Sequence, residues 1–241
     1  MRIKSRFKTA QFLIQYRYYI LETWFKNRSI QGTPKMCNVC GWEGKSFNAF
    51  FNEMCRMKDP TLCPKCASSV YQRALVEYLK DNFSSDKVYK ILEVSPHSSD
   101  PVGAVLKKNS YISIDIAKGR AMVEMDLRKL LYKDNSFDIV VCSAVLEHIK
   151  EDLVALKEIY RVLRPKGIAV IEIPMGYYGD MEGTRTVEFN GTPFYEHHRS
   201  YGYDFRDKMV EAGFKYRVIE FNDSRLGFES PSILGFYEGE K

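Results

Sequence analysis

The sequence lacks a long uninterrupted hydrophobic run, an internal repeat and a low-complexity tract. Its most apolar N-terminal stretch, residues 12–25, is interrupted by Arg17 and Glu22 and is shorter than the ~20 residues that span a bilayer. We also recognise no secretory signal, so we expect a cytoplasmic protein in a reducing compartment. Apolar residues make up 45% of the chain, which is enough for one α/β domain with a small appendage.

Excess positive charge is missing from most of the chain. Residues 1–30 carry a charge of +6 and the remainder carries −1, so we expect nucleic acid not to be the main partner. The same segment is rich in tyrosine and contains Trp24, which predicts a basic aromatic helix. Such a helix suits either anionic lipid or packing on the protein itself, and both alternatives stay open. The first implies peripheral contact with the inner face of the membrane through residues 1–28.

Four of the six cysteines form two C-x2-C pairs, Cys37/Cys40 and Cys63/Cys66, separated by 22 residues. Four thiolates supply a closed tetrahedral site for structural zinc, which leaves no position for catalysis. The sequence therefore predicts a zinc-ribbon-like module over residues 31–68, which is too small to fold without the metal. A redox dithiol and metal-free or disulfide forms are the alternatives.

Residues 69–241 alternate strand and helix patterns, which predicts one domain with a mostly parallel sheet. We expect a Rossmann-like, doubly wound, seven-stranded α/β fold with helices on both faces. The expected strands are 88–94, 111–116, 122–125, 137–142, 168–173, 215–221 and 233–237, and the clearest helices are 152–163 and 204–212.

Acidic residues stand at the ends of three successive predicted strands: Glu93, Asp115 and Asp126. Ligands of open parallel sheets lie at the carboxyl ends of the strands, and an acid ~20 residues after the first strand accepts ribose hydroxyls. We therefore expect these three carboxylates to converge on one adenosine.

Six motifs between about Lys87 and Phe221 resemble the class I S-adenosylmethionine (SAM)-dependent methyltransferases of the type 11 kind. They are Ile91-Leu92-Glu93-Val94-Ser95-Pro96, Ser113-Ile114-Asp115, Met125-Asp126-Leu127, Asn135-Ser136-Phe137-Asp138-Ile139-Val140, Leu146-Glu147-His148-Ile149 and Leu163-Arg164-Pro165-Lys166-Gly167. The resemblance implies SAM as cofactor, with Glu93 beside the methionine moiety, Asp115 on the ribose, and Asp126 with the backbone of Leu127 at the adenine. The further cofactor-binding positions that it implies are Val94, Ser95, Pro96, Ile116, Cys142 and Ser143.

One part of the resemblance departs from the family pattern. The family has acid-x-Gly-x-Gly after the first strand, where glycine lets backbone approach the ligand, whereas this chain has Ser95 and His97. Either the loop takes another path or cofactor affinity is reduced. The cysteine region resembles a sub-branch in which a zinc knuckle precedes such a domain and the glycine loop is replaced.

The best cluster for acceptor chemistry is the segment 195–201, which contains two histidines, the side chains that titrate near neutrality. The sub-branch implies a histidine near His198 and an aromatic residue at Tyr201, so we expect His198, rather than His197, to act as general base. The alternative is a loop histidine that is hydrogen-bonded within its own segment. The fourth strand also lacks Asn/Asp-Pro-Pro-Tyr/Phe, which marks enzymes acting on amino groups of bases or glutamine.

The sequence thus predicts a SAM-dependent methyltransferase that acts on a hydroxyl or amine of a small molecule, sugar or lipid-linked glycan precursor. A methyltransferase-like scaffold protein without catalysis is the first alternative, because the glycines are missing. An RNA methyltransferase that docks through the zinc module is the second.

Overall fold

The computed structural model describes residues 34–47, 62–83, 87–97, 101–105, 110–175, 183–186, 197–221, 223–227 and 234–241. The helix predicted over residues 1–30 lies outside them. The described residues form two compact units: the first runs up to Ala74 and includes 223–227, and the second holds the rest. The described helices are all too short or too polar to cross a membrane.

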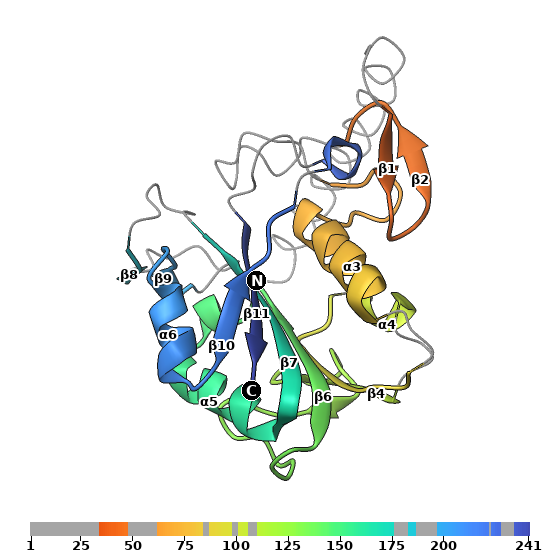
Figure 1. The fold of residues 1–241 in the computed structure, drawn as a ribbon. Helices are drawn as coiled ribbons and strands as arrows, with labels where there is room; N and C mark the ends of the chain where they lie inside the picture. Colours follow the sequence, from red (N-terminus) through yellow and green to blue (C-terminus); the bar gives the residue numbers. More distant parts are fainter. Residues whose placement is uncertain are drawn as a thin grey trace, which may run out of the picture. The chain divides into compact units, whose positions relative to one another are not determined.

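The described elements follow the order that the sequence predicts, a small cysteine-bearing part and then alternating strands and helices (Figure 1). They are β1 (Lys35–Cys37), β2 (Trp42–Gly44), α3 (Val70–Phe83), β3 (Lys90–Val94), α4 (Pro101–Val105), β4 (Ser110–Asp115), β5 (Val123–Glu124), β6 (Phe137–Ser143), η1 (Leu146–His148), α5 (Asp152–Val162), β7 (Leu163–Pro174), β8 (Arg185–Thr186), β9 (Arg199–Ser200), α6 (Phe205–Glu211), β10 (Lys215–Val218), η2 (Ser224–Leu226) and β11 (Leu234–Glu240).

The second unit is built on a seven-stranded sheet with the order β10-β11-β7-β6-β3-β4-β5. Neighbouring strands from β5 to β7 run parallel, and β11 is antiparallel to both of its neighbours. The chain proceeds outward from β3 to β4 and β5 and then returns to β6 on the other side of β3. This reversal creates a switch point between β3 and β6, and it confirms the predicted doubly wound α/β fold.

Helices cover both faces of this sheet, as the long apolar strand patterns require. Adjacent residues of β11 point to opposite faces. Tyr237 packs against Phe205 of α6 with ring centroids 5.0 Å apart, whereas Glu238 accepts a hydrogen bond from Tyr78 of α3. Thus α3 and α6 lie on opposite faces, and Figure 1 shows α5 on the same face as α6.

Several predicted strand boundaries differ from the structure, and two of the larger differences lie at β7 and β10. We expected a strand over residues 168–173, but β7 begins at Leu163, and a register shift opposite Phe137/Ile139 accommodates the extra residues. Lys166 takes a left-handed backbone conformation there, with φ of 63°. The strand predicted to reach residue 221 ends at Val218, because its pairing with β11 ends there.

The first unit is organised around the cysteines and a buried arginine. β1 and β2 form an antiparallel hairpin in which Cys37 pairs with Trp42. Arg73 is fully buried, donates hydrogen bonds to the carbonyls of Leu226 (2.8 Å) and Ser68 (2.7 Å), and stacks 3.7 Å from the Phe47 ring centre. The first unit continues past residue 68, the predicted end of the cysteine module, to Ala74.

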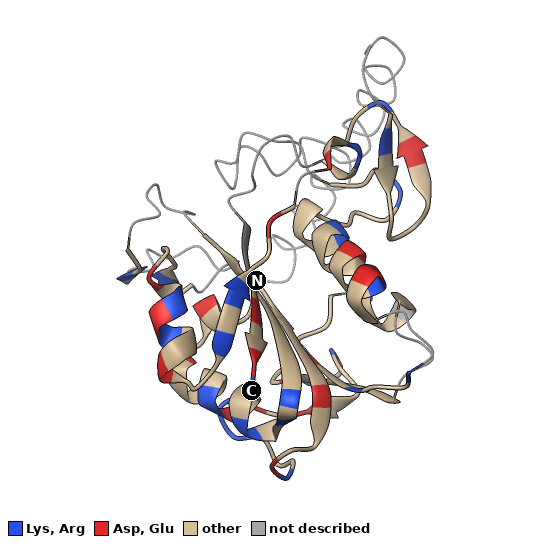
Figure 2. Ribbon diagram, viewed as in Figure 1, with Lys and Arg blue, Asp and Glu red and all other residues tan. Residues whose placement is uncertain are grey.

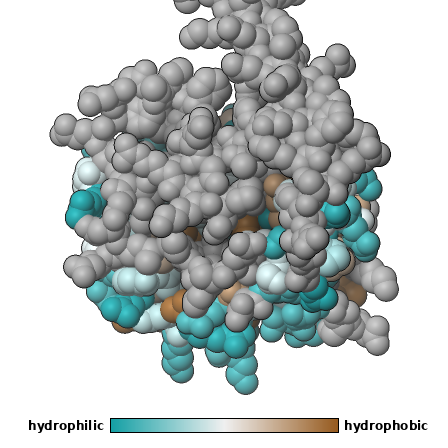
Figure 3. All heavy atoms as spheres, turned by 90° about the horizontal axis from the view of Figure 1, so that it is seen from above, coloured by the Kyte–Doolittle hydropathy of each residue, from teal (hydrophilic) through white to brown (hydrophobic). Residues whose placement is uncertain are grey.

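The described surface mixes charged and apolar groups. Figure 2 shows basic and acidic residues interspersed along α6, which includes the run Arg206-Asp207-Lys208. In Figure 3 most described residues are hydrophilic, with smaller hydrophobic patches between them. This mixture fits the near-neutral charge that the sequence has outside residues 1–30.

Candidate functional site

A cavity of about 610 Å³ lies at the carboxyl ends of β3, β4, β5 and β6, at the switch point of the sheet. Every residue that lines it belongs to the second unit. The lining residues are Val94, Ser95, Asp115, Ile116, Ala117, Arg120, Met125, Asp126, Leu127, Arg128, Ala144, Val145, His148, Ile149, Lys150, Glu151 and His198.

Asp115 is the best-defined acid of this cavity. It ends β4 and is 6% exposed. One carboxylate oxygen accepts the Ala117 N–H at 2.6 Å, and the other accepts the Ser95 hydroxyl at 2.8 Å. The Arg120 Nε lies 3.8 Å from that second oxygen. A carboxylate held from two sides in this way is oriented before any ligand arrives.

Two non-glycine residues with a left-handed backbone flank the switch point. Ser95 follows β3 with φ of 51°, and Ala144 follows β6 with φ of 52°. This conformation costs ~1 kcal/mol or more for a residue with a Cβ and is concentrated at functional sites. Ser95 therefore adopts a glycine-like backbone conformation without being a glycine.

Asp126 borders the cavity as part of an ion network. Both of its carboxylate oxygens bind the Arg128 guanidinium, at 2.7–3.1 Å, and Arg128 also binds Glu151 at 2.7 Å. The hydrogen bonds from Arg128 lower the pKa of Asp126. Asp126 therefore remains an anion, although an arginine already occupies both of its oxygens.

The cavity brings together six of the ten predicted cofactor-binding residues, namely Val94, Ser95, Asp115, Ile116, Asp126 and Leu127. Glu93, Pro96, Cys142 and Ser143 are not among the lining residues. Glu93 is buried and accepts a hydrogen bond from Tyr111 on the next strand, so two of the three acids share the cavity rather than all three. We predicted a strand that ends at Cys142, but β6 extends to Ser143. The turn that lines the cavity therefore begins at Ala144.

The two candidate histidines differ in position. His198 is exposed and lines the cavity, and its backbone N–H donates to the Glu147 carbonyl at 2.7 Å. His197 is 5% exposed and packs against His148, with ring centroids 4.6 Å apart. Burial, and then the charge of His148, lower the pKa of His197 to about 4. His198 therefore borders the cavity, whereas His197 is buried.

Tyr201, the third candidate, lies in the core and not at the cavity. It is fully buried, and its hydroxyl donates to Asp152 at 2.8 Å. Arg199 and Lys208 also pair with Asp152. Burial alone would raise the pKa of Asp152, but the hydrogen bonds from Arg199, Tyr201 and Lys208 hold it below its usual value. This cluster ties the segment around His198 to the start of α5.

Beside the cavity lie two buried carboxyl groups that the sequence analysis did not single out. Glu172 accepts the Ser143 hydroxyl at 2.6 Å, and burial raises its pKa to about 7. Glu147 is 1% exposed, and burial together with the charge of Glu172 raises its pKa to about 8. No sequence signal could pair these acids, because their electrostatic interaction depends on how β6, β7 and η1 pack.

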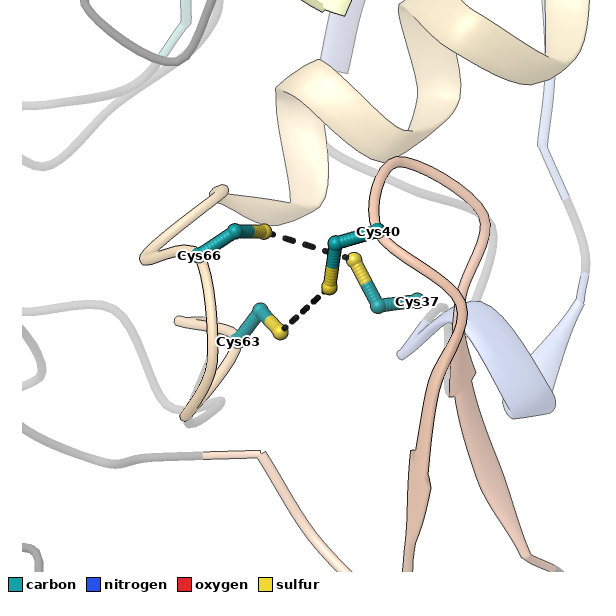
Figure 4. Close-up of side chains that lie close together, drawn as sticks. All are labelled: Cys37, Cys40, Cys63 and Cys66. Atoms are coloured by element: carbon teal, nitrogen blue, oxygen red, sulfur yellow. Dashed lines mark hydrogen bonds between the residues drawn. The ribbon is translucent and has the colours of Figure 1, made fainter.

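The four predicted zinc ligands form a cluster in the first unit. Figure 4 shows the sulfurs of all four pointing toward one another from two segments of the chain. The sulfurs of Cys37 and Cys66 lie 3.7 Å apart, and those of Cys40 and Cys63 lie 3.6 Å apart. Four sulfurs around zinc at ~2.3 Å would be ~3.8 Å from one another, so the cluster fits this metal.

Comparison with known proteins adds a family match. Residues 73–171 match the family described as a methyltransferase domain. The chain has no match among curated proteins.

Two solved structures share the fold. The 1,6-didemethyltoxoflavin-N1-methyltransferase of Burkholderia thailandensis, solved with 1,6-didemethyltoxoflavin and S-adenosylhomocysteine, is 14% identical; the match covers 70% of this chain and 78% of that one, with a TM-score of 0.53. A candidate SAM-dependent methyltransferase of Listeria monocytogenes is 13% identical and covers 70% of this chain and 99% of its own, with a TM-score of 0.51. The family match therefore covers residues 73–171, and the two solved structures show the fold that this chain shares with them.

Proposed function

We propose that the chain is a methyltransferase that transfers the methyl group of SAM to a hydroxyl or amine of a small molecule, a sugar or a lipid-linked glycan precursor. The observation that carries the proposal is Asp115, a buried and oriented carboxylate at the switch-point cavity, where ribose hydroxyls are bound in such sheets. The matched methyltransferase domain supports the class of reaction.

The residues of the cavity fit SAM. Its volume of about 610 Å³ is ordinary for a small-molecule site. Asp115 would accept the ribose hydroxyls, and the exposed Ile116 and the backbone of Leu127 would flank the adenine. When bound, SAM supplies a methyl carbon that its sulfonium makes electrophilic. The part of the protein is to hold the acceptor in line with that carbon and to take its proton.

His198 is our candidate for that proton acceptor, because its exposed side chain borders the same cavity as Asp115. His198→Ala should depress methyl transfer while leaving the affinity for S-adenosylhomocysteine unchanged. Transfer of labelled methyl groups from SAM to a panel of hydroxyl and amine acceptors measures the first quantity, and calorimetry measures the second. Unchanged transfer by the variant would rule out this role for His198.

The decisive experiment is titration of the full chain with S-adenosylhomocysteine in a calorimeter. We expect saturable binding of one equivalent, with competition by SAM. Absence of binding to folded protein would contradict the proposed function, whichever acceptor is used.

A scaffold protein without catalysis is the second candidate, and one observation favours it. The Ser95 hydroxyl occupies a carboxylate oxygen of Asp115 that ribose would need, at a position where the resembled family has glycine. A scaffold need not bind S-adenosylhomocysteine, so the same titration separates the two candidates.

We also propose that the four-cysteine cluster binds one structural zinc ion. The spacing of its sulfurs supports this, and four thiolates leave no open position for catalysis. Metal analysis of the purified full chain should give one zinc per chain in this site. Protein that is folded and metal-free in the first unit would refute the assignment.

For location, we propose a cytoplasmic protein whose basic segment, residues 1–28, contacts anionic lipid. The charge of +6 on residues 1–30 supports electrostatic attraction to an anionic surface. The full chain should co-sediment with vesicles that contain phosphatidylserine, and a chain without residues 1–28 should not. Equal sedimentation of both would remove the membrane proposal.

A further inference from the structure

Three metal-ligand side chains that the proposed cofactor site does not use gather beside the cavity. Glu147 and His148 belong to η1, and His197 lies just before β9. One donor atom from each lies within 4.8 Å of the other two, and Glu147 Oε1 is 3.8 Å from His148 Nε2. His197 comes from a distant part of the sequence, so only the folded chain brings the three together.

Glu147 supplies a second, independent observation. Its side chain is 1% exposed, and among the described residues its Oε2 atom has no hydrogen-bond partner. A buried polar atom left in this state costs ~1–3 kcal/mol, and more if the group is charged. A cation bound by Oε2 would remove this cost, whereas an empty site leaves it uncompensated.

The geometry suits one metal ion. Two ligand atoms that each bind an ion at ~2.1 Å lie ~3.0 Å apart at a right angle and ~4.2 Å apart when opposite. The separations in this cluster are close to that range, so small side-chain movements complete the site. The backbone bond from His198 N–H to the Glu147 carbonyl, at 2.7 Å, holds the two contributing segments together.

The ligand types select the class of metal. One carboxylate and two imidazoles suit zinc, manganese, iron or cobalt, whereas magnesium and calcium prefer oxygen ligands alone. Three protein ligands also leave positions open, unlike the closed four-cysteine cluster.

We propose that Glu147, His148 and His197 bind one divalent transition-metal ion. His148 lines the cavity, so the open positions of the ion are available to water or to an oxygen atom of the acceptor. The binding of the ion stands by itself, and its contact with an acceptor rests on the proposed function. An acceptor held in this way would carry a hydroxyl group, because an ionised oxygen is a good ligand for such ions.

Full chain that retains one zinc ion, in the four-cysteine cluster, after excess zinc has been removed should be titrated with Mn²⁺ while the electron paramagnetic resonance signal of free Mn²⁺ is recorded. Co²⁺ provides a second probe, because a site with nitrogen and oxygen ligands lacks the intense thiolate absorption of cobalt in a four-cysteine site. We expect one equivalent to bind. Glu147→Gln and His197→Ala should each weaken binding at least ~100-fold, since even outer residues of metal sites contribute 10–100-fold.

Two matched controls test the assignment. Glu151→Gln removes an exposed carboxylate from the same cavity, and His198→Ala removes the neighbouring histidine; both should bind Mn²⁺ as the parent chain does. Because Glu147→Gln keeps the size of the side chain, melting curves can verify that this variant is folded.

Three results would overturn the inference: no bound Mn²⁺ or Co²⁺ beyond the zinc, binding that survives both ligand substitutions, or cobalt spectra that show thiolate ligands. Binding of S-adenosylhomocysteine is measured on the same samples. If the chain binds S-adenosylhomocysteine but no metal ion at this site, the metal site is refuted and the methyltransferase proposal stands. If it binds the metal ion but not S-adenosylhomocysteine, the methyltransferase proposal alone is refuted.

Discussion

Asp115→Asn tests the central carboxylate most directly. Asparagine can keep the bond from the Ala117 N–H, because its amide oxygen accepts in the same place at about the same distance as the present 2.6 Å. Its amide nitrogen then replaces the oxygen that now accepts from Ser95, and the Ser95 hydroxyl can turn to accept instead. The fold should therefore survive with little loss of stability.

Binding of S-adenosylhomocysteine by Asp115→Asn should be weaker than binding by the parent chain. A ribose hydroxyl that donates to the Asp115 carboxylate would instead meet an N–H donor, and a hydrogen bond to a charged group is lost. Such a bond contributes ~1.5–3 kcal/mol, which corresponds to a dissociation constant ~10–150-fold weaker. Calorimetric titration with S-adenosylhomocysteine measures this directly, and melting curves verify the fold.

Glu124→Gln is the matched control. Glu124 pairs with Asp115 across β4 and β5, is exposed and does not line the cavity, so its substitution removes the same charge from the same edge of the sheet. We expect its affinity to stay within about threefold of the parent chain. Unchanged affinity in folded Asp115→Asn, or equal losses in both variants, would refute the contact between Asp115 and the ribose.

Three further predictions concern the loop that begins at Ser95, the cysteine cluster and a buried ion cluster. Ser95→Gly relieves the left-handed backbone strain of ~1 kcal/mol, whereas Ser95→Ala keeps the strain, so the glycine variant should have the higher free energy of unfolding of the two; the reverse order in denaturant unfolding would contradict the argument. Cys37→Ser should release zinc and unfold the first unit, seen by metal analysis and hydrogen exchange, while Cys142→Ala, a buried cysteine outside the cluster, should keep the metal. Asp152→Asn should cost about 3 kcal/mol at pH 7, because it breaks a buried ion cluster, against under ~0.5 kcal/mol for the exposed Asp134→Asn. The pKa of Asp152 is lowered in the folded state. The carboxylate therefore stabilises the fold above the unfolded pKa of ~3.9, and this stabilisation is lost as pH falls through the folded pKa. In denaturant melts, the difference in free energy of unfolding between the parent chain and Asp152→Asn should accordingly be smaller at pH 3 than at pH 7. A difference that is independent of pH would contradict this assignment.

The sequence determined the fold and much of the candidate cofactor site, because both depend on local patterns. The apolar run of Phe137–Ser143 and the acid that ends Ser110–Asp115 identify parallel strands and their carboxyl ends without any knowledge of packing. The positions of Asp115 and Asp126 at the cavity followed from this order alone. The two cysteine pairs are likewise local, since a spacing of two residues is enough to direct both sulfurs to one point.

Tertiary structure decided which of these side chains are available to a ligand. Glu93 stands at a predicted strand end, but a tyrosine on the neighbouring strand occupies its carboxylate. Tyr201 stands in a segment rich in candidate residues, yet it is buried on Asp152, because the face that a residue presents depends on what packs against it. The gathering of Glu147, His148 and His197 is equally invisible in sequence, since contact between residues so far apart follows from the path of the chain and not from any local pattern.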